Sequence, residues 1–358
     1  MWFAGRSEGQ EYNVAQQRGF KFAAIKASRF PTGISAALLL FALRTVVAFA
    51  QASFWIWRIR PCLILGFGGY VSFPIVLAGI AGRVPVFLQE QNVVPGKVNR
   101  ILSKWVKGMF TSFEETAGMV RCAVYQTGTP TRFESRGRND SAVCREKLGL
   151  EPSRKTIFAF GGSQGAVSIN RAMLEFAELE KENHELQVLH LTGERNFEEV
   201  KGQYEKILPS EIAGVKVQLL SSSNATHHAP CTTHGLMVLV KPYLEEMDLG
   251  YGAADIVVCR AGAATLAELM DFGVPAVLVP YPHATEAHQE RNAEIMERAG
   301  AAAVLSNGLL SGEKILSLTR ELFGNPGVLS SMAQKSKSFR AGNATDRIIE
   351  VTRQYIRG

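Results

Sequence analysis

The sequence predicts an α/β protein of two domains with parallel sheets, and three observations support that prediction. Short apolar runs alternate with helical stretches through most of the 358 residues. Many of these runs are continuously apolar, which is typical of strands buried on both faces of a parallel sheet. The length itself favours two domains, because one domain usually takes about 100–200 residues.

The predicted strands are the apolar runs bounded by turn residues or helical stretches. They cover residues 20–25, 62–65, 84–88, 108–112, 156–160, 187–191, 215–220, 238–240, 256–259, 276–279 and 302–305. The short run at 2–5 also resembles a strand. This alternation weakens between residues 129 and 153, where the chain becomes polar and charged. We therefore place the domain linker at 128–132.

The composition is that of a folded protein with a moderate positive charge. Hydrophobic residues make up 46% and charged residues 20%, which excludes a disordered or fibrous chain. The 39 basic and 33 acidic residues leave a net charge of +6. This charge suits an anionic partner, such as a phosphate substrate or an acidic lipid surface, and is equally compatible with ordinary surface lysines.

The cysteines argue against both a disulfide framework and a zinc centre. There are five of them, and no two are spaced C-x-x-C, which favours a reducing compartment. The polar segment 221–235 holds three histidines and one cysteine, but without the fixed spacing of a zinc site. We interpret this segment as a solvent-exposed loop.

An apolar segment at 34–57 is long enough to cross a bilayer, which takes about 20 residues. Its polar neighbours Arg44, Gln51 and Arg58 recur every seven positions and so share one helix face. A strand-like run follows directly. We predict a helix that lies on a sheet with an apolar outer face, and a transmembrane span is the alternative. The first ten residues lack the order of a secretory signal.

Two loops in the second half follow predicted strands and suit a nucleotide. Gly161-Gly162-Ser163-Gln164-Gly165 opens a helix, where glycines let backbone N–H groups approach a phosphate. The segment 259–268 opens another helix and places Thr265 and Glu268 on one of its faces. A carboxylate there can accept both hydroxyls of a ribose.

A third loop follows the strand at 276–279 and carries Gln289 and Asn292, which can bridge sugar hydroxyls. Loops that follow parallel strands meet at the same sheet edge. We therefore predict one ligand site built from these three loops, although each loop alone is also explained as an ordinary turn or a solvated surface.

The first half has two similar loops, at 66–72 and 89–92. A helix is predicted over 95–109, in which the basic residues are spaced three, four and three and so form one stripe beside Trp105. The stripe consists of Lys97, Arg100, Lys104 and Lys107. A basic stripe next to a tryptophan suits an anionic membrane surface, and a merely solvated face is the alternative.

Five segments, in order and suitably spaced, resemble the MurG family of N-acetylglucosamine (GlcNAc) transferases. They are GFGGYVS, EQN followed by VPGKVN, FGGSQGA, CRAGAATLAE and HQERNA. The resemblance spans nearly the whole chain and implies the GT-B fold, two Rossmann-like domains whose parallel sheets face a cleft. It implies an acceptor- and membrane-facing domain at 1–132, joined by a C-terminal helix at about 341–358, and a UDP-GlcNAc-binding domain at 133–340.

The same resemblance implies roles for single residues. Asn92 would meet the donor sugar, Arg132 would lie at the hinge, and Ser163 would contact the diphosphate. Gln289 would contact GlcNAc and Glu268 the ribose. The residues implied around the uridine are Leu244, Ala263, Ala264, Thr265, Leu266, Ala267 and Glu268. The residues implied on the acceptor side are Tyr70 and Glu90, with Glu90 as a weak candidate for the general base.

The sequence departs from the family at two points. Gln89 stands where the family has a histidine before E-Q-N. The family also begins with a strand and a G-G-T-G-G-H loop, ahead of the point that corresponds to Met1, and that loop carries the histidine proposed as base. We therefore expect a chain that starts at Met1 to have little activity and an upstream-extended form to be active.

The activity that the resemblance implies is an inverting transfer of GlcNAc from UDP-GlcNAc to the 4-hydroxyl of undecaprenyl-diphosphate-MurNAc-pentapeptide, without a cofactor. The predicted donor loops contain no D-x-D carboxylate pair, so an essential metal ion is not implied. The expected place is the cytoplasmic side of the bacterial inner membrane, with peripheral attachment to its anionic surface. Other cell-wall synthesis proteins are expected as partners, and nucleic acid is not. Two alternatives remain: transfer to another lipid such as diacylglycerol, or a truncated, non-catalytic member that binds donor or partners.

Overall fold

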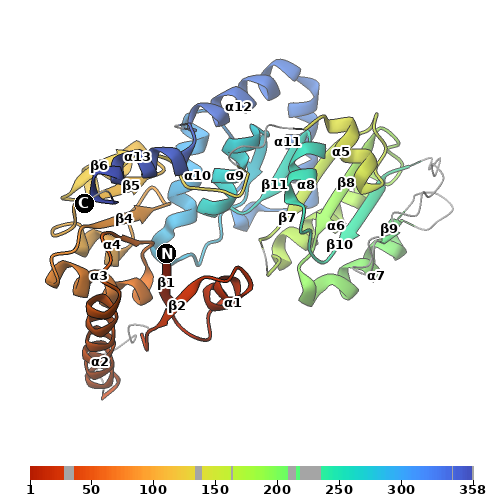
Figure 1. Ribbon diagram of the computed structural model, residues 1–358. Helices are drawn as coiled ribbons and strands as arrows, with labels where there is room; N and C mark the ends of the chain where they lie inside the picture. The colour runs from red at the N-terminus through yellow and green to blue at the C-terminus, as the bar shows by residue number, and fades with distance from the viewer. Residues whose placement is uncertain are drawn as a thin grey trace. The chain divides into compact units, whose positions relative to one another are not determined.

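The computed structural model describes residues 1–27, 36–133, 139–162, 164–208, 215–217, 235–340 and 342–356. By its internal contacts the chain divides into unit 1, Met1–Pro130 with Ala341–Gly358, and unit 2, Thr131–Arg340 (Figure 1). The predicted boundary lies two residues further along, between 132 and 133. Both units are α/β, and the strand pairs within the described residues are parallel, as predicted.

Unit 1 contains two sheets. One pairs β1 with β2, and the other has the order β3-β4-β5-β6. The elements of unit 1 are β1 (Trp2–Gly5), α1 (Gln10–Gln17), β2 (Lys21–Ala24), α2 (Ala36–Ile59), β3 (Ile64–Gly66), α3 (Gly69–Ala81), β4 (Val86–Glu90), α4 (Lys97–Leu102), β5 (Gly108–Thr111), the 3-10 helix η1 (Glu114–Met119), β6 (Ala123–Gln126) and α13 (Ala344–Ile356).

The four-stranded sheet of unit 1 is covered on both faces. Val86 and Leu88 of β4 pack with Val76 of α3 in one apolar cluster. The residue between them, Phe87, packs on the other face with Ile348 of α13. Because successive strand residues point to opposite faces, the last helix of the chain completes the core of the first unit.

Two predictions for unit 1 need correction. The helix predicted over 95–109 ends at Leu102, because Lys107 must already donate its N–H to the Val86 carbonyl at 2.8 Å as the chain enters β5. Strand β6 was not predicted at all. Its four residues are partly exposed and polar at one end, so they show neither an apolar run nor a clear alternation.

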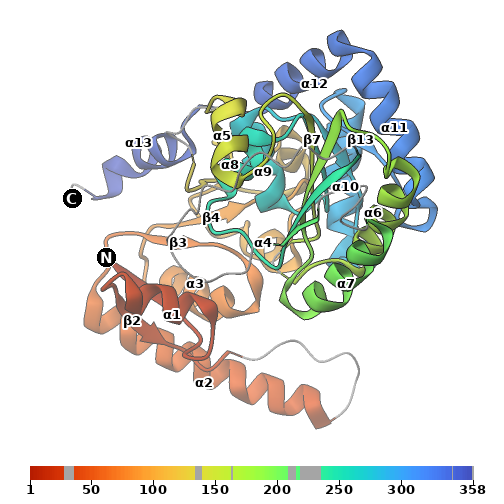
Figure 2. The same cartoon turned by 90° about the vertical axis from the view of Figure 1, so that its right-hand side faces the viewer.

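Helix α2 lies along α3, as Figure 2 shows, and fully buries a narrow stripe of small residues, flanked by the half-buried Phe49 and Ile56. Ala48 and Ala52 are fully buried and pack with Ala78 of α3. Gln51, on a neighbouring face, accepts the backbone N–H of Lys26 at 3.1 Å. The predicted helix with an apolar outer side is therefore present, but it packs mainly on α3, where we expected a sheet.

Unit 2 contains one seven-stranded parallel sheet in the order β13-β12-β11-β7-β8-β10-β9. Its elements are α5 (Ser141–Leu148), β7 (Lys155–Phe160), α6 (Val167–Glu180), β8 (Leu186–Leu191), η2 (Glu194–Asn196), α7 (Phe197–Ile207), β9 (Val215–Val217), β10 (Met237–Lys241), α8 (Met247–Ala253), β11 (Ile256–Cys259), α9 (Ala263–Phe272), β12 (Ala276–Leu278), η3 (Thr285–Ala287), α10 (His288–Arg298), β13 (Ala303–Val304), η4 (Asn307–Leu309), α11 (Gly312–Gly324) and α12 (Pro326–Ser338).

The sheet of unit 2 is buried on both faces, which explains the continuous apolar runs. Ile157 and Ala159 of β7 pack in one large cluster with side chains of α6, α7 and α11. Phe158 and Phe160 point the other way, toward Tyr251 of α8. The strand order reverses between β7 and β11, which are hydrogen-bonded neighbours. Of the polar segment 221–235, only residue 235 is described.

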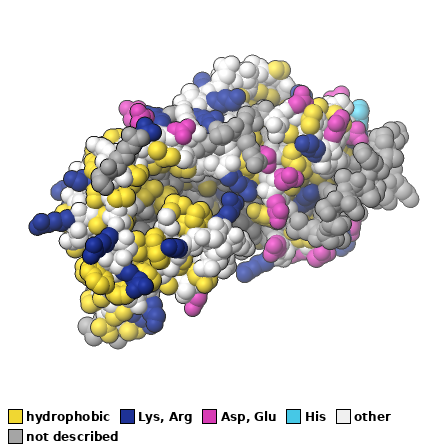
Figure 3. Space-filling model, in the orientation of Figure 1, with side chains coloured by type: hydrophobic (Ala, Val, Ile, Leu, Met, Phe, Trp, Pro, Cys, Tyr) yellow, Lys and Arg dark blue, Asp and Glu magenta, His cyan; other side chains and the backbone are white. Residues whose placement is uncertain are grey.

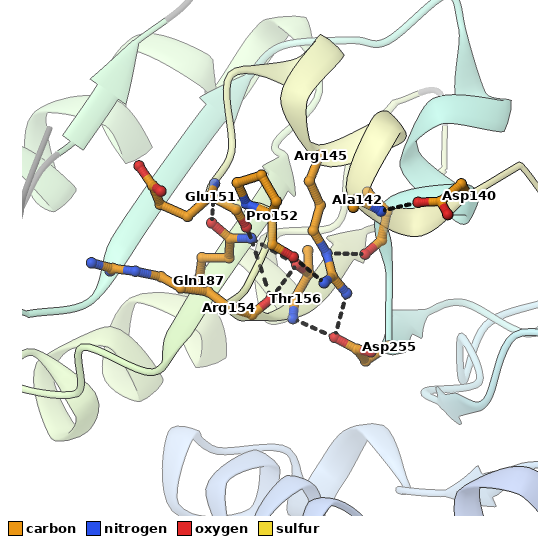
Figure 4. A network of polar contacts seen from close by, with 10 residues as sticks. Asp140, Ala142, Arg145, Glu151, Pro152, Arg154, Thr156, Gln187 and Asp255 are labelled. Atoms are coloured by element: carbon orange, nitrogen blue, oxygen red, sulfur yellow. Dashed lines mark hydrogen bonds and ion pairs between the residues drawn. The ribbon is translucent and has the colours of Figure 1, made fainter. Parts of the chain in front are cut away.

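A buried ion pair holds α5 and β11 at the amino end of the sheet (Figure 4). Arg145 donates from Nη2 to Asp255 Oδ2 at 2.8 Å, and from Nε to the Ala253 carbonyl at 3.0 Å. Asp255 Oδ2 also accepts the backbone N–H of Thr156 at 2.8 Å. The side chains of Arg145 and Asp255 are only 8% and 23% exposed, so this pair is desolvated but has several partners.

Asp271, near the end of α9, joins the two points where the chain enters and leaves unit 2. Thr131 Oγ1 donates to Asp271 Oδ2, and Arg340 Nε donates to Asp271 Oδ1 at 3.1 Å. The Asp271 side chain is almost fully buried. One carboxylate therefore fixes the first and the last residue of this unit to the same helix.

His190 on β8 forms a second buried polar network. Its Nε2 lies 3.1 Å from Asn170 Oδ1 and its Nδ1 lies 2.9 Å from the Tyr204 hydroxyl. Because the Asn170 amide donates to the Thr192 carbonyl, its oxygen accepts from His190, and the Tyr204 O–H donates to Nδ1. Burial lowers the pKa of His190 to about 3, so this imidazole is neutral in the folded protein.

We expect Arg145→Met to lower the free energy of unfolding by about 3–5 kcal/mol, because it leaves a partly buried carboxylate without its cation. Urea denaturation at neutral pH measures this change. The matched control is Arg171→Met, which removes an exposed pair with Glu175 whose arginine side chain is 83% exposed and should cost at most about 1 kcal/mol. If the two substitutions lowered the free energy of unfolding equally, the buried Arg145–Asp255 pair would not have the stabilising role assigned to it.

We also expect the stability of the protein to fall as the pH drops below about 6.5, the pKa of an unfolded histidine. Below about pH 6.5 the histidine of the unfolded chain binds a proton, whereas the buried His190 of the folded protein binds one only as the pH approaches about 3. One such group contributes a slope of about 1.4 kcal/mol per pH unit. His190→Gln should flatten the urea-unfolding profile between pH 4.5 and 6.5 by this slope, whereas His184→Gln at an exposed position should not.

Candidate functional site

The loop that follows β7 is built for close approach of backbone groups. Gly162 and Gly165 have φ values of 90° and 74°, a left-handed conformation that favours glycine. A Cβ on Gly165 would lie 2.1 Å from the Thr192 carbonyl oxygen. Helix α6 then begins with no side-chain cap from Ala166, so its first N–H groups suit an anion. The predicted contact of Ser163 lies outside the described residues.

The loop that follows β11 delivers a second uncapped helix to the same edge. Gly262 precedes α9 in an extended conformation and has no side chain to cap it. Within the predicted segment 263–268, Leu266 and Ala267 are buried in the core. The side chain of Leu244 is buried as well. What α9 presents is therefore the backbone of its first turn and the side chains of Thr265 and Glu268.

Glu268 is partly buried and its carboxylate is oriented by a group that the sequence analysis missed. The Tyr251 hydroxyl donates to Glu268 Oε2 at 2.7 Å. Burial raises the pKa of Glu268, whereas the Tyr251 hydrogen bond and the charge of Arg132 lower it and Asp271 raises it. The structure therefore brings Arg132 within electrostatic reach of Glu268. Arg132 also lies 4.8 Å from the ring centre of Phe133.

Arg260, the first residue after β11, ties the three loops together and was also missed. Its guanidinium donates to Ser168 Oγ at 2.7 Å, to Asn307 Oδ1 at 2.8 Å and to the Val279 carbonyl at 3.1 Å. These acceptors are neutral, and burial lowers the pKa of Arg260. A partly desolvated positive charge thus stands at the edge where both uncapped helices begin, which favours an anionic ligand.

The loop that follows β12 is strained where it enters α10. Glu286 and Ala287 have φ values of 55° and 53°, which is costly for residues with a Cβ and is typical of functional loops. Gln289 Oε1 accepts the Tyr281 N–H at 2.9 Å, so this side chain stays at the edge. Asn292, by contrast, is fully buried and donates to the Ala261 carbonyl. Its expected contact with a sugar hydroxyl is therefore not supported.

His288, the first residue of α10, is a further residue at this edge that the sequence analysis did not single out. Its Nε2 lies 3.6 Å from Glu286 Oε2, and its Nδ1 is buried without a hydrogen-bond partner in the described part of the chain. A buried nitrogen of this kind is normally satisfied by a ligand or by water. It adjoins Gln289 at the same edge.

In unit 1 the carboxylate of Glu90 is occupied by its own loop. Oε1 accepts the N–H of Asn92 at 3.1 Å and its amide at 3.2 Å, and Oε2 accepts the Gly96 N–H at 3.0 Å and the Asn99 amide at 2.9 Å. Four donors use the four lone-pair positions of a carboxylate. This geometry argues against Glu90 as a general base, and makes it the residue that shapes the loop holding Asn92.

The remaining residues singled out in unit 1 lie nearby. The Tyr70 hydroxyl accepts from Arg6 Nη1 at 3.1 Å, which connects α3 to the segment after β1. Gln89 is fully buried and donates to the Gly128 carbonyl at 3.2 Å. The histidine that the resemblance implied at this position is thus replaced by a residue with a structural hydrogen bond.

An exposed apolar surface covers the outer side of α2. Its large side chains are Leu40, Leu43, Val46, Val47, Phe54 and Trp57. The segment Leu40–Ile59 is long and apolar enough to cross a membrane by length and composition, and 11% of it is buried. Figure 3 shows hydrophobic side chains gathered over the region of α2 and α3, with Lys and Arg side chains among them.

The basic residues predicted as one helical stripe do not share a helix. Lys97 and Arg100 belong to α4, whereas Lys104 and Lys107 follow its end at Leu102. All four are nevertheless exposed, and so is Trp105. Only five residues, 103–107, separate the end of α4 from the start of β5, and Lys104 and Lys107 lie in this connection.

Comparison with known proteins identifies the family. Residues 3–111 match the glycosyltransferase family 28 N-terminal domain and residues 156–348 its C-terminal domain. The UDP-N-acetylglucosamine--N-acetylmuramyl-(pentapeptide) pyrophosphoryl-undecaprenol N-acetylglucosamine transferase of Halothermothrix orenii is 35% identical over 99% of this chain and 91% of its own length. The protein of the same name from Desulforudis audaxviator is 33% identical over 98% and 88%.

Solved structures agree on the fold. The crystal structure of Acinetobacter baumannii MurG has a TM-score of 0.71 at 24% identity and is covered over 90% of its chain. The UDP-GlcNAc 2-epimerase of Neisseria meningitidis, solved with UDP-GlcNAc, has a TM-score of 0.61 at 14% identity. These likenesses confirm the predicted GT-B fold. Together with the sequence identities, they place the chain in glycosyltransferase family 28 and, within it, in the MurG family.

Proposed function

We propose that this protein transfers GlcNAc from UDP-GlcNAc to the 4-hydroxyl of undecaprenyl-diphosphate-MurNAc-pentapeptide in peptidoglycan synthesis. The observation that carries the proposal is the carboxyl edge of β7, β11 and β12. There a glycine loop, two uncapped helix N-termini and the partly buried Glu268 lie on one unit. Such an edge offers positive ends to a diphosphate and one carboxylate to a ribose.

The donor is assigned to unit 2 from these positions. The diphosphate lies at the start of α6, with Ser163 and the loop 161–165. The uridine lies at the first turn of α9, Ala263 to Thr265, with its ribose on Glu268, and Leu244 contributes through its backbone. Gln289 faces the GlcNAc. The positive charge of Arg132 lowers the pKa of Glu268 and so favours its charged form.

The reaction is a single displacement at the anomeric carbon. The acceptor's 4-oxygen forms the new bond to C1 as the bond from C1 to the UDP oxygen breaks, and the proton of the hydroxyl passes to a base. The charge that develops on UDP is stabilised by N–H groups at the helix starts and by the nearby Arg260. Asn92, in the loop that Glu90 keeps in shape, is assigned to the donor sugar, and Tyr70 on α3 is assigned to the acceptor.

Glu268→Ala should weaken UDP binding by about 10- to 150-fold, since a hydrogen bond to a charged group contributes about 1.5–3 kcal/mol. Titration calorimetry of the full chain with UDP measures this change. Glu290→Ala is the control, because Glu290 is an exposed glutamate on α10 and its loss should leave the affinity within about twofold. Unchanged UDP affinity in Glu268→Ala would refute the ribose assignment.

We further propose that unit 1 attaches the enzyme peripherally to the cytoplasmic face of the inner membrane. The apolar outer side of α2 supplies surface that favours the lipid interface, with Trp57 being 69% exposed. The basic residues 97–107 supply attraction to anionic lipids. The absence of a partner for this apolar side among the described elements supports the same assignment.

Reversing the charges of Lys97, Arg100, Lys104 and Lys107 to glutamate should abolish binding to anionic vesicles in a sedimentation assay. Each basic residue contributes about 1 kcal/mol near such a surface, and salt screens this attraction. The control reverses four exposed lysines of unit 2, Lys147, Lys155, Lys206 and Lys314, and should retain binding. Attachment that survives both charge reversal and alkaline carbonate would instead indicate a membrane span.

A further inference from the structure

Tyr251 on α8 is a buried tyrosine held in an aromatic enclosure. Its ring stacks on Phe272 of α9 with centroids 5.1 Å apart and an interplanar angle of 22°. It meets Phe158 and Phe160 of β7 edge-on at 5.7 and 6.1 Å, and Phe133 at 6.5 Å. None of its surface is exposed. Aromatic contacts from three directions leave the ring little freedom.

The only polar atom of this side chain is its hydroxyl, and that hydroxyl is committed to one acceptor. It donates to Glu268 Oε2 at 2.7 Å, across the contact between α8 and α9. Burial raises the pKa of Tyr251, so the hydroxyl keeps its proton and remains a donor. A buried hydroxyl without a partner would be costly, and the enclosed ring therefore holds the Glu268 carboxylate in one orientation.

We propose that Tyr251 is a positioning residue for the donor nucleotide, which aims the Glu268 carboxylate at two adjacent hydroxyls of a ribose. Tyr251 takes one lone pair of Oε2. Oε1 and the second lone pair of Oε2 remain for the ligand, as two acceptors on one rigid plane. This inference rests on the proposed function, because it assumes that Glu268 binds the ribose.

The charge state of Glu268 makes the role measurable. The titratable groups that face it are Tyr251 from α8, Arg132 from the start of the unit, Asp271 from its own helix and Cys259 from the end of β11. Burial raises the pKa of Glu268, and the Tyr251 hydroxyl and Arg132 oppose that rise. Burial keeps the Cys259 thiol protonated by raising its pKa.

Removing the hydroxyl should therefore raise the pKa of Glu268 further. A carboxylate with a higher pKa loses its charge at a higher pH as the solution is acidified, so its ability to accept two hydroxyls is lost earlier. In a plot of donor affinity against pH, the fall in affinity on the acidic side (the acidic limb) should therefore move toward neutral pH. A tyrosine that only fills space would not move this limb.

The test is Tyr251→Phe in the full chain, with UDP-GlcNAc as donor and a lipid-linked muramyl-pentapeptide as acceptor, between pH 5 and 8.5. We expect the KM for UDP-GlcNAc and the Kd for UDP to rise about 5- to 20-fold at pH 7.5, with kcat at saturating donor within about twofold. We also expect the midpoint of the acidic limb to shift upward. An unchanged KM and an unchanged limb would overturn the proposal.

Tyr204→Phe is the matched control for lost stability. Tyr204 is also a fully buried tyrosine whose hydroxyl donates to one partner, His190, in a different network. Tyr204→Phe should lower the unfolding temperature about as much as Tyr251→Phe does, and should leave the KM for UDP-GlcNAc and its pH profile unchanged. If both substitutions raise the KM equally, the effect is one of stability and the proposal fails.

A double-mutant cycle separates this inference from the proposed function. In the Glu268→Ala background, Tyr251→Phe should no longer weaken UDP binding, because its effect passes through the missing carboxylate. Fully additive effects would overturn the positioning role. If Glu268→Ala alone leaves UDP affinity unchanged, the ribose assignment fails. If Glu268→Ala weakens binding and Tyr251→Phe does not, only the positioning inference fails.

Discussion

The hydrogen-bonded pairing of β11 with β7 is the constraint on which the candidate site depends. The chain builds β8, β9 and β10 on one side of β7 and then returns to place β11 on the other. Cys259 at the end of β11 thereby comes into register with Phe160 at the end of β7, and Leu278 of β12 with Cys259. Three loops that are far apart in sequence must end at one edge, and open α/β sheets bind ligands at the point where the strand order reverses.

Polar groups with several partners hold the loops and helix ends of unit 2 in place. Arg260 is half-buried at the carboxyl edge, whereas His190 and Asp271 are buried elsewhere in the unit, and each has two or more hydrogen-bond partners. Such groups are costly when a partner is missing and strongly orienting when all are present. They connect loops and helix ends, which apolar contacts fix less specifically.

Unit 1 shows the opposite use of apolar surface. Helix α2 fully buries a stripe of small residues against α3, half-buries Phe49 and Ile56 beside it, and exposes large apolar side chains on its outer side. Exposure of a contiguous apolar face in water is unfavourable and marks a surface that meets something apolar. In the same unit, the Glu90 loop is closed by four hydrogen bonds to one carboxylate. Unit 1 thus combines a rigid loop at a strand end with a helix whose outer apolar side chains are exposed.

The sequence by itself determined the α/β class, nearly all the strands and the loops of the site. Continuous apolar runs and glycines at strand ends are local signals, and they predicted the positions of β7 and β11 closely. It also singled out Glu268, a carboxylate in the second turn of α9. It predicted a helix over 95–109, longer than α4, because the pairing that ends this helix involves Val86, a residue distant in sequence.

Only the tertiary structure decided which side chains at that edge are available. Asn292 belongs to the core although the exposed Arg291 precedes it in the chain, since a helix turns neighbouring positions to different faces. In unit 1, the carboxylate of Glu90 accepts hydrogen bonds from donors up to nine residues away, which occupy its lone pairs. Tyr251 and Arg260 act through partners 17 and 47 residues away. Such pairings leave no periodicity in the sequence, because they arise only when separate strands and helices are packed together.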